Sequence, residues 1–152
     1  MTRTLLIFAA LALGVATVFA QSDVNAARKE FMKDYRKFGD NTVSRMARDQ
    51  MPYDQAKVDE AMAHFAETAA KIPSLFPAGG FQGPVADSNY FAAAKAFENQ
   101  SDIQARTEKF AKDIADAKGK IRDLASLKEI WLPLYDKNCS SCHEAYRLRR
   151  PS

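Results

Sequence analysis

Two cysteines and a histidine near the end of the chain have the spacing of a cofactor attachment site. Cys139, Cys142 and His143 spell C-x-x-C-H within the stretch NCSSCHEAYRLRRPS. On a helix, residues three apart project to the same side, so both thiols face one surface and the imidazole lies one step further round. This geometry suits two thioether bonds to the vinyl groups of a haem, with the imidazole on the iron, and C-x-x-C-H predicts that chemistry.

Other chemistries of two cysteines fit this sequence less well. A redox-active dithiol of the thioredoxin type sits at a helix start near a βαβ pattern, and the sequence has no such pattern. A plain disulfide is the simplest alternative, and a zinc site would need more ligands than the motif supplies. We therefore predict one haem c per chain, attached covalently through Cys139 and Cys142, with His143 on the iron.

The other axial ligand of the iron must come from earlier in the chain, because no methionine or histidine follows His143. His64 lies one step off the apolar stripe of its segment, so we expect it to face solvent. Apart from Met1, four methionines remain. Each is by default a residue that fills a gap in the core, so geometry has to choose between them.

Distances along the helices separate these methionines. In an antiparallel bundle the end of the last helix lies beside the start of the first. His143 is about 9 Å from its helix end and Met32 about 12 Å from its helix start, so the two are level. Met46 lies roughly 21 Å further along, and Met51 is in the turn beyond it. Met62 faces inward on the returning helix and stays a weaker candidate, and an open sixth position is the main alternative to Met32.

The first 20 residues have the composition of a secretory signal peptide. Arg3 precedes an apolar run from Leu5 to Thr17, and Ala20 supplies a small residue at the end. No later segment approaches the roughly 20 apolar residues of a membrane span. We therefore predict a signal peptide at residues 1–20, one domain at residues 21–152, and export to the periplasm.

The composition limits the classes of function. A hydrophobic content of 47% excludes a disordered chain. Without the leader, which contains one of the 22 basic residues, the balance against 19 acidic residues is only two positive charges. No nucleic-acid partner is expected, because such a protein would need a concentrated basic face. The one dense basic cluster, Arg147, Arg149 and Arg150, is explained at least as well by a solvated helix end.

Four segments have the apolar spacing of amphipathic helices. We expect helices at roughly 24–48, 54–73, 103–117 and 126–149, with a start as early as Phe91 open for the third. Pro52 and Gly119 supply breaks, and three prolines and three glycines between Pro73 and Asn89 predict a long ordered loop. No strand pattern is present. The predicted fold class is all-α, an antiparallel four-helix bundle with one haem near the C-terminus.

Local signals mark the ends of these helices. Asp54 can cap the second helix. Ser126 and Glu129 fit an S-x-x-E capping box at the start of the fourth. Pro133 lies inside that last helix, where it removes one backbone donor and is expected to introduce a kink.

Several stretches together resemble the class II c-type cytochromes, the family of cytochrome c′ and its low-spin relatives. They are CSSCHEAYR at the end, PYDQAKVDEAM and KIPSLFP around the second helix, DAKGKI closing the third, and KEFMKDYR early in the first. The resemblance covers essentially all of residues 21–152. It implies a four-helix bundle with haem near the end of the last helix.

The resemblance also bears on the distal ligand. High-spin members carry an apolar residue on the first helix and leave the iron open to NO or CO, whereas low-spin members carry a methionine, often within LMK. The FMK stretch places Met32 at that position. From Met32 to the PYD motif this chain has one residue more than its low-spin relatives, and without an insertion the matching residue is Lys33. Arg147 stands where the family usually has a basic residue, so it is implied to lie near the proximal side or a propionate, or else to be a solvated arginine.

The function implied is that of a one-electron carrier with His143 and Met32 on the iron, exchanging electrons with transient redox partner proteins and catalysing no reaction. The alternative is a gas-binding protein of the cytochrome c′ type, its open distal face lined by Phe31. A peroxidase-like site would need a polar distal residue that the first helix does not offer. Dimers through the first two helices are common in the family. A stripe of Tyr35, Phe38 and Val43 fits either such a homodimer or the core.

Overall fold

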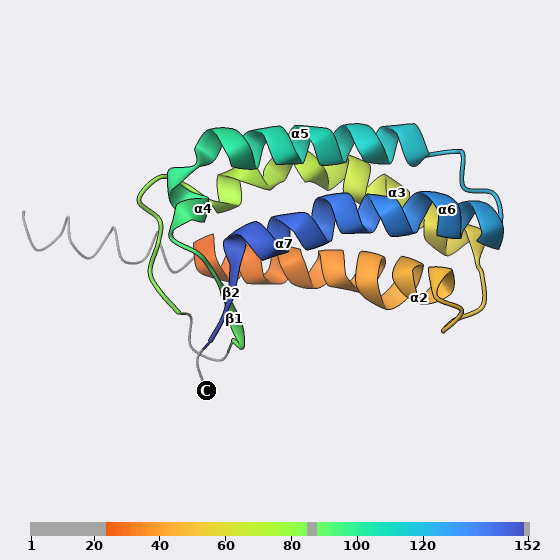
Figure 1. The fold of residues 1–152 in the computed structure, drawn as a ribbon, viewed down its shortest axis with the longest axis horizontal. Coiled ribbons are helices and arrows are strands. Elements are labelled where there is room, and N and C mark those ends of the chain that lie inside the picture. Colours follow the sequence, from red (N-terminus) through yellow and green to blue (C-terminus); the bar gives the residue numbers. More distant parts are fainter. Residues whose placement is uncertain (1–23, 85–87, 151–152) are drawn as a thin grey trace, which may run out of the picture.

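The computed structural model describes residues 24–84 and 88–150, and within them four long helices run antiparallel to one another (Figure 1). The predicted signal peptide lies outside the described residues. The first helix covers residues 24–47, of which 24–35 are α-helical, followed by the π-helix η1 (Arg36–Val43) and α2 (Ser44–Ala47). The second consists of α3 (Gln55–Thr68) and two 3-10 turns, η2 (Ala69–Lys71) and η3 (Pro73–Leu75).

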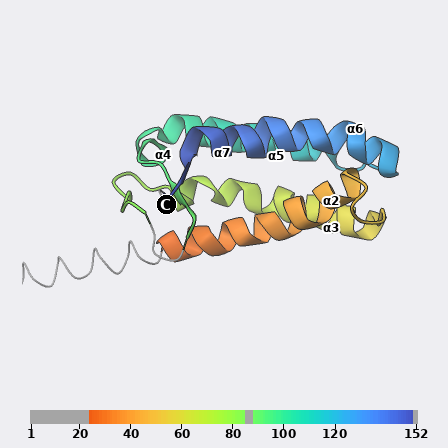
Figure 2. The ribbon, with the colours of Figure 1, turned by 60° about the horizontal axis from the view of Figure 1, so that its bottom comes forward.

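The third and fourth helices complete the bundle. The third consists of the short α4 (Lys95–Glu98) and the long α5 (Gln100–Ala117). The fourth runs from α6 (Leu124–Tyr135) through the π-helix η4 (Asp136–Ser140) into α7 (Ser141–Tyr146). Each helix contacts its neighbours in sequence, and the first also lies against the last, as Figures 1 and 2 show. The predicted four-helix bundle is confirmed, and this closed arrangement brings the start of the first helix to the attachment motif.

The predicted helix boundaries hold where a capping side chain or a glycine marks them. The side chain of Asp54 accepts a hydrogen bond from the backbone N–H of Lys57 at 3.2 Å, so it caps α3 as expected. Gly119 adopts φ +80° just after α5, a conformation that costs glycine little. The capping box of α6, however, is formed by Asp123 and Ser126. The expectation of Ser126 and Glu129 was wrong, because the helix begins one turn earlier than the S-x-x-E pattern indicates.

A main core runs through most of the bundle and draws residues from all four helices. Its largest fully buried side chain is Trp131, whose Nε1 donates a hydrogen bond at 2.9 Å to Oγ of the buried Ser44. Gly39 is buried against this core, and a Cβ added there would lie at ordinary van der Waals distances, 3.4 Å from the Phe65 ring and 3.7 Å from Trp131. Val43 is fully buried, and Tyr35 and Phe38 pack against this core, so the stripe of three belongs to the interior.

A second, smaller group of buried residues lies at the other end of the bundle and is called the end cluster here. It consists of Leu75, Phe76, Ala96, Phe97, Ile103 and Tyr146. These side chains come from the end of the second helix, the start of the third and the end of the fourth. The end cluster is therefore built where the start of the first helix meets the attachment motif.

A two-stranded antiparallel ribbon follows the last helix. Strand β1 (Tyr90–Ala92) pairs with β2 (Arg147–Arg149) in the register Tyr90 to Arg149 and Ala92 to Arg147. The expectation that no strand forms was wrong, and so were the proposed helix end near Arg149 and the helix start near Phe91. Three alternating residues are too few to produce a visible strand pattern, and the pairing of distant segments supplies the missing stability.

Two further features concern the helices as a whole. Pro133 lies inside α6, and the helix continues through it before it changes to the π pattern at Asp136. Among residues 24–84 and 88–150, no helix is long and apolar enough to cross a membrane.

Candidate haem site

The two cysteines of the motif lie on the inner side of the last helix. Cys139 is in η4 and Cys142 in α7, and both are partly buried free thiols. Burial, followed by the charges of Cys142 and Asp40, raises the pKa of the Cys139 thiol to about 12, and burial also raises the pKa of Cys142. A reactive dithiol needs a lowered pKa, so these thiols are unlike those of a redox-active pair. Of the two, Cys142 packs against the apolar residues Leu75, Phe76, Ala96, Phe97, Ile103 and Tyr146.

His143 is prepared to act as a neutral ligand. Its side chain is partly buried, and that burial, together with the charge of Arg147, lowers the pKa of the imidazole to about 4. At neutral pH the ring therefore carries a free nitrogen lone pair. Metal coordination by histidine requires this deprotonated form, so the imidazole fits the predicted bond to iron without first losing a proton.

The structure separates the four methionines that the sequence left as candidates. Met32 and Cys142 both pack against the end cluster. Met46 and Met62 are almost completely buried in the main core, and Met51 packs against that core from outside. Only Met32, among the methionines that the structure describes, therefore shares a cluster with a residue of the attachment motif.

His64 does not face solvent, contrary to the sequence-based expectation. Its ring stacks on Phe38 with centroids 4.3 Å apart and meets Tyr35 edge-on at 5.7 Å. Its Nε2 is buried and has no hydrogen-bond partner among the described residues. The interior between the first two helices is wide enough to accept a residue one step off the apolar stripe. His64 packs with main-core residues and takes no part in the end cluster.

Arg147 is close to the site but not in the manner expected from a helix. It is the first residue of β2, with extended backbone angles, so the four-residue helical spacing from His143 does not apply. Its side chain is exposed, and its guanidinium lies 4.6 Å from the centre of the Tyr90 ring. The charge is still near enough to lower the pKa of His143.

Two charged groups at the site escaped the sequence reasoning. Arg28, one helical turn before Met32, lies over the rings of Phe76 and Phe97 at 5.4 and 5.1 Å and donates to the carbonyl of Leu75 at 3.0 Å. Burial lowers the pKa of this guanidinium. The i, i+4 spacing from Arg28 to Met32 was a usable signal, because it places both on one helical face.

The second group surrounds Tyr146, which is buried in the end cluster. Its hydroxyl donates to the carboxylate of Asp102, and Nε of Arg106 donates to the same oxygen at 2.7 Å. These two bonds lower the pKa of Asp102. Through the Tyr146 hydroxyl, the carboxylate of Asp102 thus links α5 to the helix that carries the attachment motif. The spacing of Asp102 and Arg106 predicts their pairing, but not the tyrosine between helices.

Comparison with known proteins identifies the family. Residues 23–147 match the family model described as Cytochrome C′. The chain belongs to the cytochrome c′ family. It is 34% identical over 149 residues to cytochrome c-555 of Bradyrhizobium diazoefficiens, covering 98% of this chain and 99% of that protein. It is 36% identical to cytochrome c-556 of Rhodopseudomonas palustris, covering 97% of each.

Solved structures in the cytochrome c′ family have the same fold. Cytochrome c′ from Rhodopseudomonas palustris superposes with a TM-score of 0.72 at 31% identity, covering 85% of this chain and 98% of that one. The structure of oxidised cytochrome c556 from the same organism gives 0.71 at 32% identity, covering 86% and 99%. The protein is a monohaem c-type cytochrome with covalently bound haem c. Cys139 and Cys142 have the arrangement that this attachment requires.

Proposed function

We propose that this cytochrome is a one-electron carrier of the periplasm, with low-spin iron held between His143 and Met32. The observation that carries the proposal is the shared position of Met32 and Cys142 against the end cluster. The signal peptide of residues 1–20 would direct export, and transient redox proteins would be the partners. A filled sixth position suits this role, because little has to move when the electron arrives or leaves.

The π-helix η1 supports Met32 over Lys33 as the distal residue. A π-helical stretch holds one more residue than an α-helix of the same span, so it can absorb a single insertion. Segment η1 lies between Met32 and Pro52, where the extra residue relative to low-spin members falls. Lys33 has an exposed side chain and pairs with Glu30 at 3.1 Å. The first helix thus keeps Met32 on the inner face despite the longer sequence.

The residues around the site have distinct roles in this proposal. When bound, the haem supplies the one-electron couple of ferric and ferrous iron. His143 provides a neutral imidazole, and the soft thioether of Met32 favours the reduced state and raises the potential. The end cluster keeps water away from these ligands. Arg28, one turn before Met32, and Arg147, whose charge acts on His143, would supply positive charge that can balance the carboxylates of a bound haem.

The visible spectrum of the haem-loaded protein, with and without carbon monoxide, tests this function. We expect a low-spin spectrum with a weak far-red methionine-to-ferric band that carbon monoxide leaves unchanged. Met32→Leu should remove that band and admit the gas, whereas Met51→Leu, which changes a methionine at the opposite end, should do neither. A high-spin wild-type spectrum that shifts with carbon monoxide would replace the proposal with a gas-binding cytochrome whose distal face includes Phe31.

A further inference from the structure

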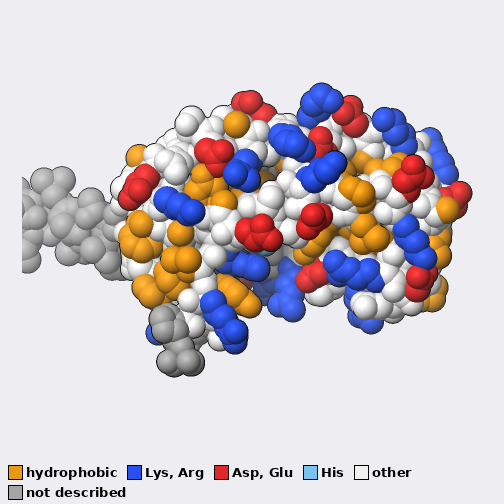
Figure 3. Space-filling view, viewed as in Figure 1, with side chains coloured by type: hydrophobic (Ala, Val, Ile, Leu, Met, Phe, Trp, Pro, Cys, Tyr) orange, Lys and Arg blue, Asp and Glu red, His pale blue; other side chains and the backbone are white. Residues whose placement is uncertain are grey.

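The ribbon of β1 and β2 presents a basic and apolar surface. Opposite residues of an antiparallel pair share a face, so Tyr90, Arg147 and Arg149 project from the same side. The guanidinium of Arg147 rests on the Tyr90 ring at 4.6 Å. Tyr90 is 46% exposed on this face, whereas Leu148, which is 47% exposed, lies on the opposite face with Phe91. Figure 3 shows basic and apolar side chains next to one another in this region.

The arginines of this ribbon form no ion pair with any carboxylate of the residues that the structure describes. Seven ion pairs occur among the described residues, and they involve lysines and arginines of the helices or their turns. Within residues 24–84 and 88–150, none of Arg147, Arg149 and Arg150 has an acidic partner. Other cations of the described residues, such as Lys118, Lys120 and Arg122, also form no ion pair, and the ribbon differs from them in joining its arginines to the exposed ring of Tyr90.

The ribbon is fixed in place beside the attachment motif. The backbone N–H of Ala93 donates to the carbonyl of Tyr146 at 2.8 Å, and the N–H of Arg150 donates to the carbonyl of Asn89 at 2.9 Å. Tyr146 is itself buried in the end cluster with Cys142. The positive surface is therefore continuous with the helix that carries His143, and little conformational freedom is lost when something binds to it.

We propose that the face of the ribbon with Tyr90, Arg147 and Arg149, together with Arg150 just after β2, is the docking surface for a redox partner protein with an acidic face. The proposal rests on the electron-carrier function proposed above. Exposed tyrosine and arginine are the residue types most enriched in interface centres. Opposite charge raises the encounter rate of transient partners and orients them, and docking here would place the partner beside the helix that carries the attachment motif. An acidic protein surface would supply carboxylates, with which these arginines form no ion pair among the described residues.

Electron-transfer rates with small charged probes test the charge of this surface. In each reaction one electron leaves ferrous haem and reduces either hexacyanoferrate(III), an anion, or tris(phenanthroline)cobalt(III), a cation. The test variant combines Arg147→Gln, Arg149→Gln and Arg150→Gln. Its control combines Lys118→Gln, Lys120→Gln and Arg122→Gln, which removes equal charge from the turn between α5 and α6 at the opposite end of the bundle (Figure 1).

At low ionic strength we expect the arginine variant to react roughly 3- to 10-fold more slowly with the anion and faster with the cation, and the difference should shrink as salt is added. The control variant should change both rates much less. Equal effects of the two triple variants would overturn the proposal. Because the spectrum reports the ligands of the iron independently, a gas-binding spectrum would refute the carrier function without changing what these rates say about the ribbon.

Chemical-shift mapping of the labelled cytochrome with an acidic flavodoxin as the probe locates the contact. Perturbed amides in residues 88–93 and 146–150, lost in the arginine variant, are expected. Perturbations centred elsewhere would refute the ribbon as the docking surface. Sedimentation with phosphatidylglycerol vesicles tests the alternative that this surface binds an anionic membrane. If the arginines are needed for vesicle binding and not for binding the flavodoxin, the surface binds membranes and the proposal fails.

Discussion

Met32 and Cys142 lie near opposite ends of the described chain, and both pack against the end cluster. They reach the same cluster because the first helix lies against the last helix and so closes the bundle. The remaining methionines of the described chain are held by the main core. The division of the interior into two clusters thus places Met32, the proposed distal ligand, in the same cluster as a residue of the attachment motif.

The register of the first helix is tested by substituting neighbouring residues. Lys33→Ala should leave the low-spin spectrum unchanged, because the side chain is exposed and paired with Glu30. Met32→Leu in the same background should convert it to a high-spin spectrum. Absorption spectra of both haem-loaded variants provide the measurement. If Lys33→Ala alone changes the spin state, the insertion is not absorbed by η1, and the ligand assignment moves by one residue.

Ser44→Ala should destabilise the protein through a distant core contact. The change leaves the buried Nε1 of Trp131 without its acceptor at 2.9 Å. An unsatisfied buried donor costs about 1–3 kcal/mol, and urea unfolding measures the loss. Ser74→Ala is the control, because its exposed hydroxyl bonds only to the nearby carbonyl of Lys71. A loss no greater than that of the control would mean that Trp131 finds another partner.

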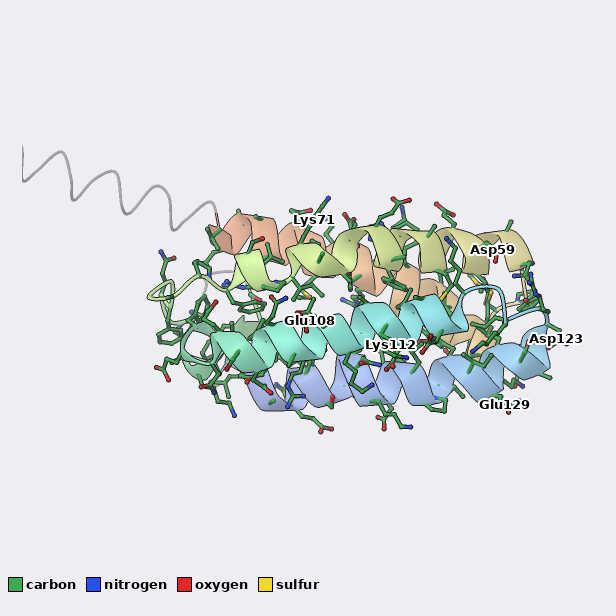
Figure 4. All side chains as sticks on the ribbon, turned by 90° about the horizontal axis from the view of Figure 1, so that it is seen from above. Asp59, Lys71, Glu108, Lys112, Asp123 and Glu129 are labelled. Carbon is green, nitrogen blue, oxygen red and sulfur yellow. The ribbon has the colours of Figure 1, made fainter. Side chains whose placement is uncertain are left out.

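The capping box at the start of α6 is formed by Asp123 and Ser126, and Figure 4 shows Asp123 at the beginning of this helix and Glu129 further along it. Asp123 accepts from the backbone N–H of Ser126 at 2.7 Å, and this bond holds the pKa of its carboxyl below the usual range. Asp123→Ala should therefore lower the urea midpoint, and Asp123→Asn should largely restore it because asparagine also caps helices. Glu129→Ala should have little effect. A larger drop of the urea midpoint in Glu129→Ala than in Asp123→Ala would indicate that Ser126 and Glu129 form the capping box.

Alkaline pH should weaken the contact between the first two helices. Burial raises the pKa of Tyr35 to about 12, against the smaller lowering effect of its hydrogen bond with Thr68. Between the ordinary pKa of about 10 and this value, the folded state binds more protons than the unfolded state, so the free energy of unfolding falls as pH rises. The full shift corresponds to roughly 3 kcal/mol. Since the ring is only partly buried, we expect about 1–2 kcal/mol.

Comparison with Tyr35→Phe isolates this effect. The variant lacks the ionisable hydroxyl, so the difference in unfolding free energy between it and the wild type should change between pH 10 and 12. Urea unfolding at several pH values measures that difference. A difference independent of pH would mean that Tyr35 ionises as readily in the folded protein as in the unfolded chain.

The sequence predicted the elements that follow from local periodicity. The apolar spacing gave four helices in the right order, and Asp54 and Gly119 marked boundaries through local chemistry. The attachment motif and the level of Met32 followed from helix geometry. Each of these depends on residues within a few turns of one another, or on the simple rule that successive helices run antiparallel.

What the sequence did not predict depends on contacts between distant segments. Strand β2 exists because residues 147–149 meet residues 90–92, and neither segment alone carries a strand pattern. His64 was misplaced because the width of the space between two helices cannot be read from one apolar stripe. The half-buried Arg28 was missed for a related reason, since its aromatic neighbours Phe76 and Phe97 come from a different part of the chain.

The two buried clusters divide the protein into parts of unequal resistance to local opening. The main core joins all four helices and contains no residue of the attachment motif, so its backbone amides should exchange with solvent only when the whole bundle unfolds. The end cluster is smaller and is fastened by a three-residue ribbon. A chain without attached haem would keep a helical remnant around Trp131 and fray first at the end that carries His143.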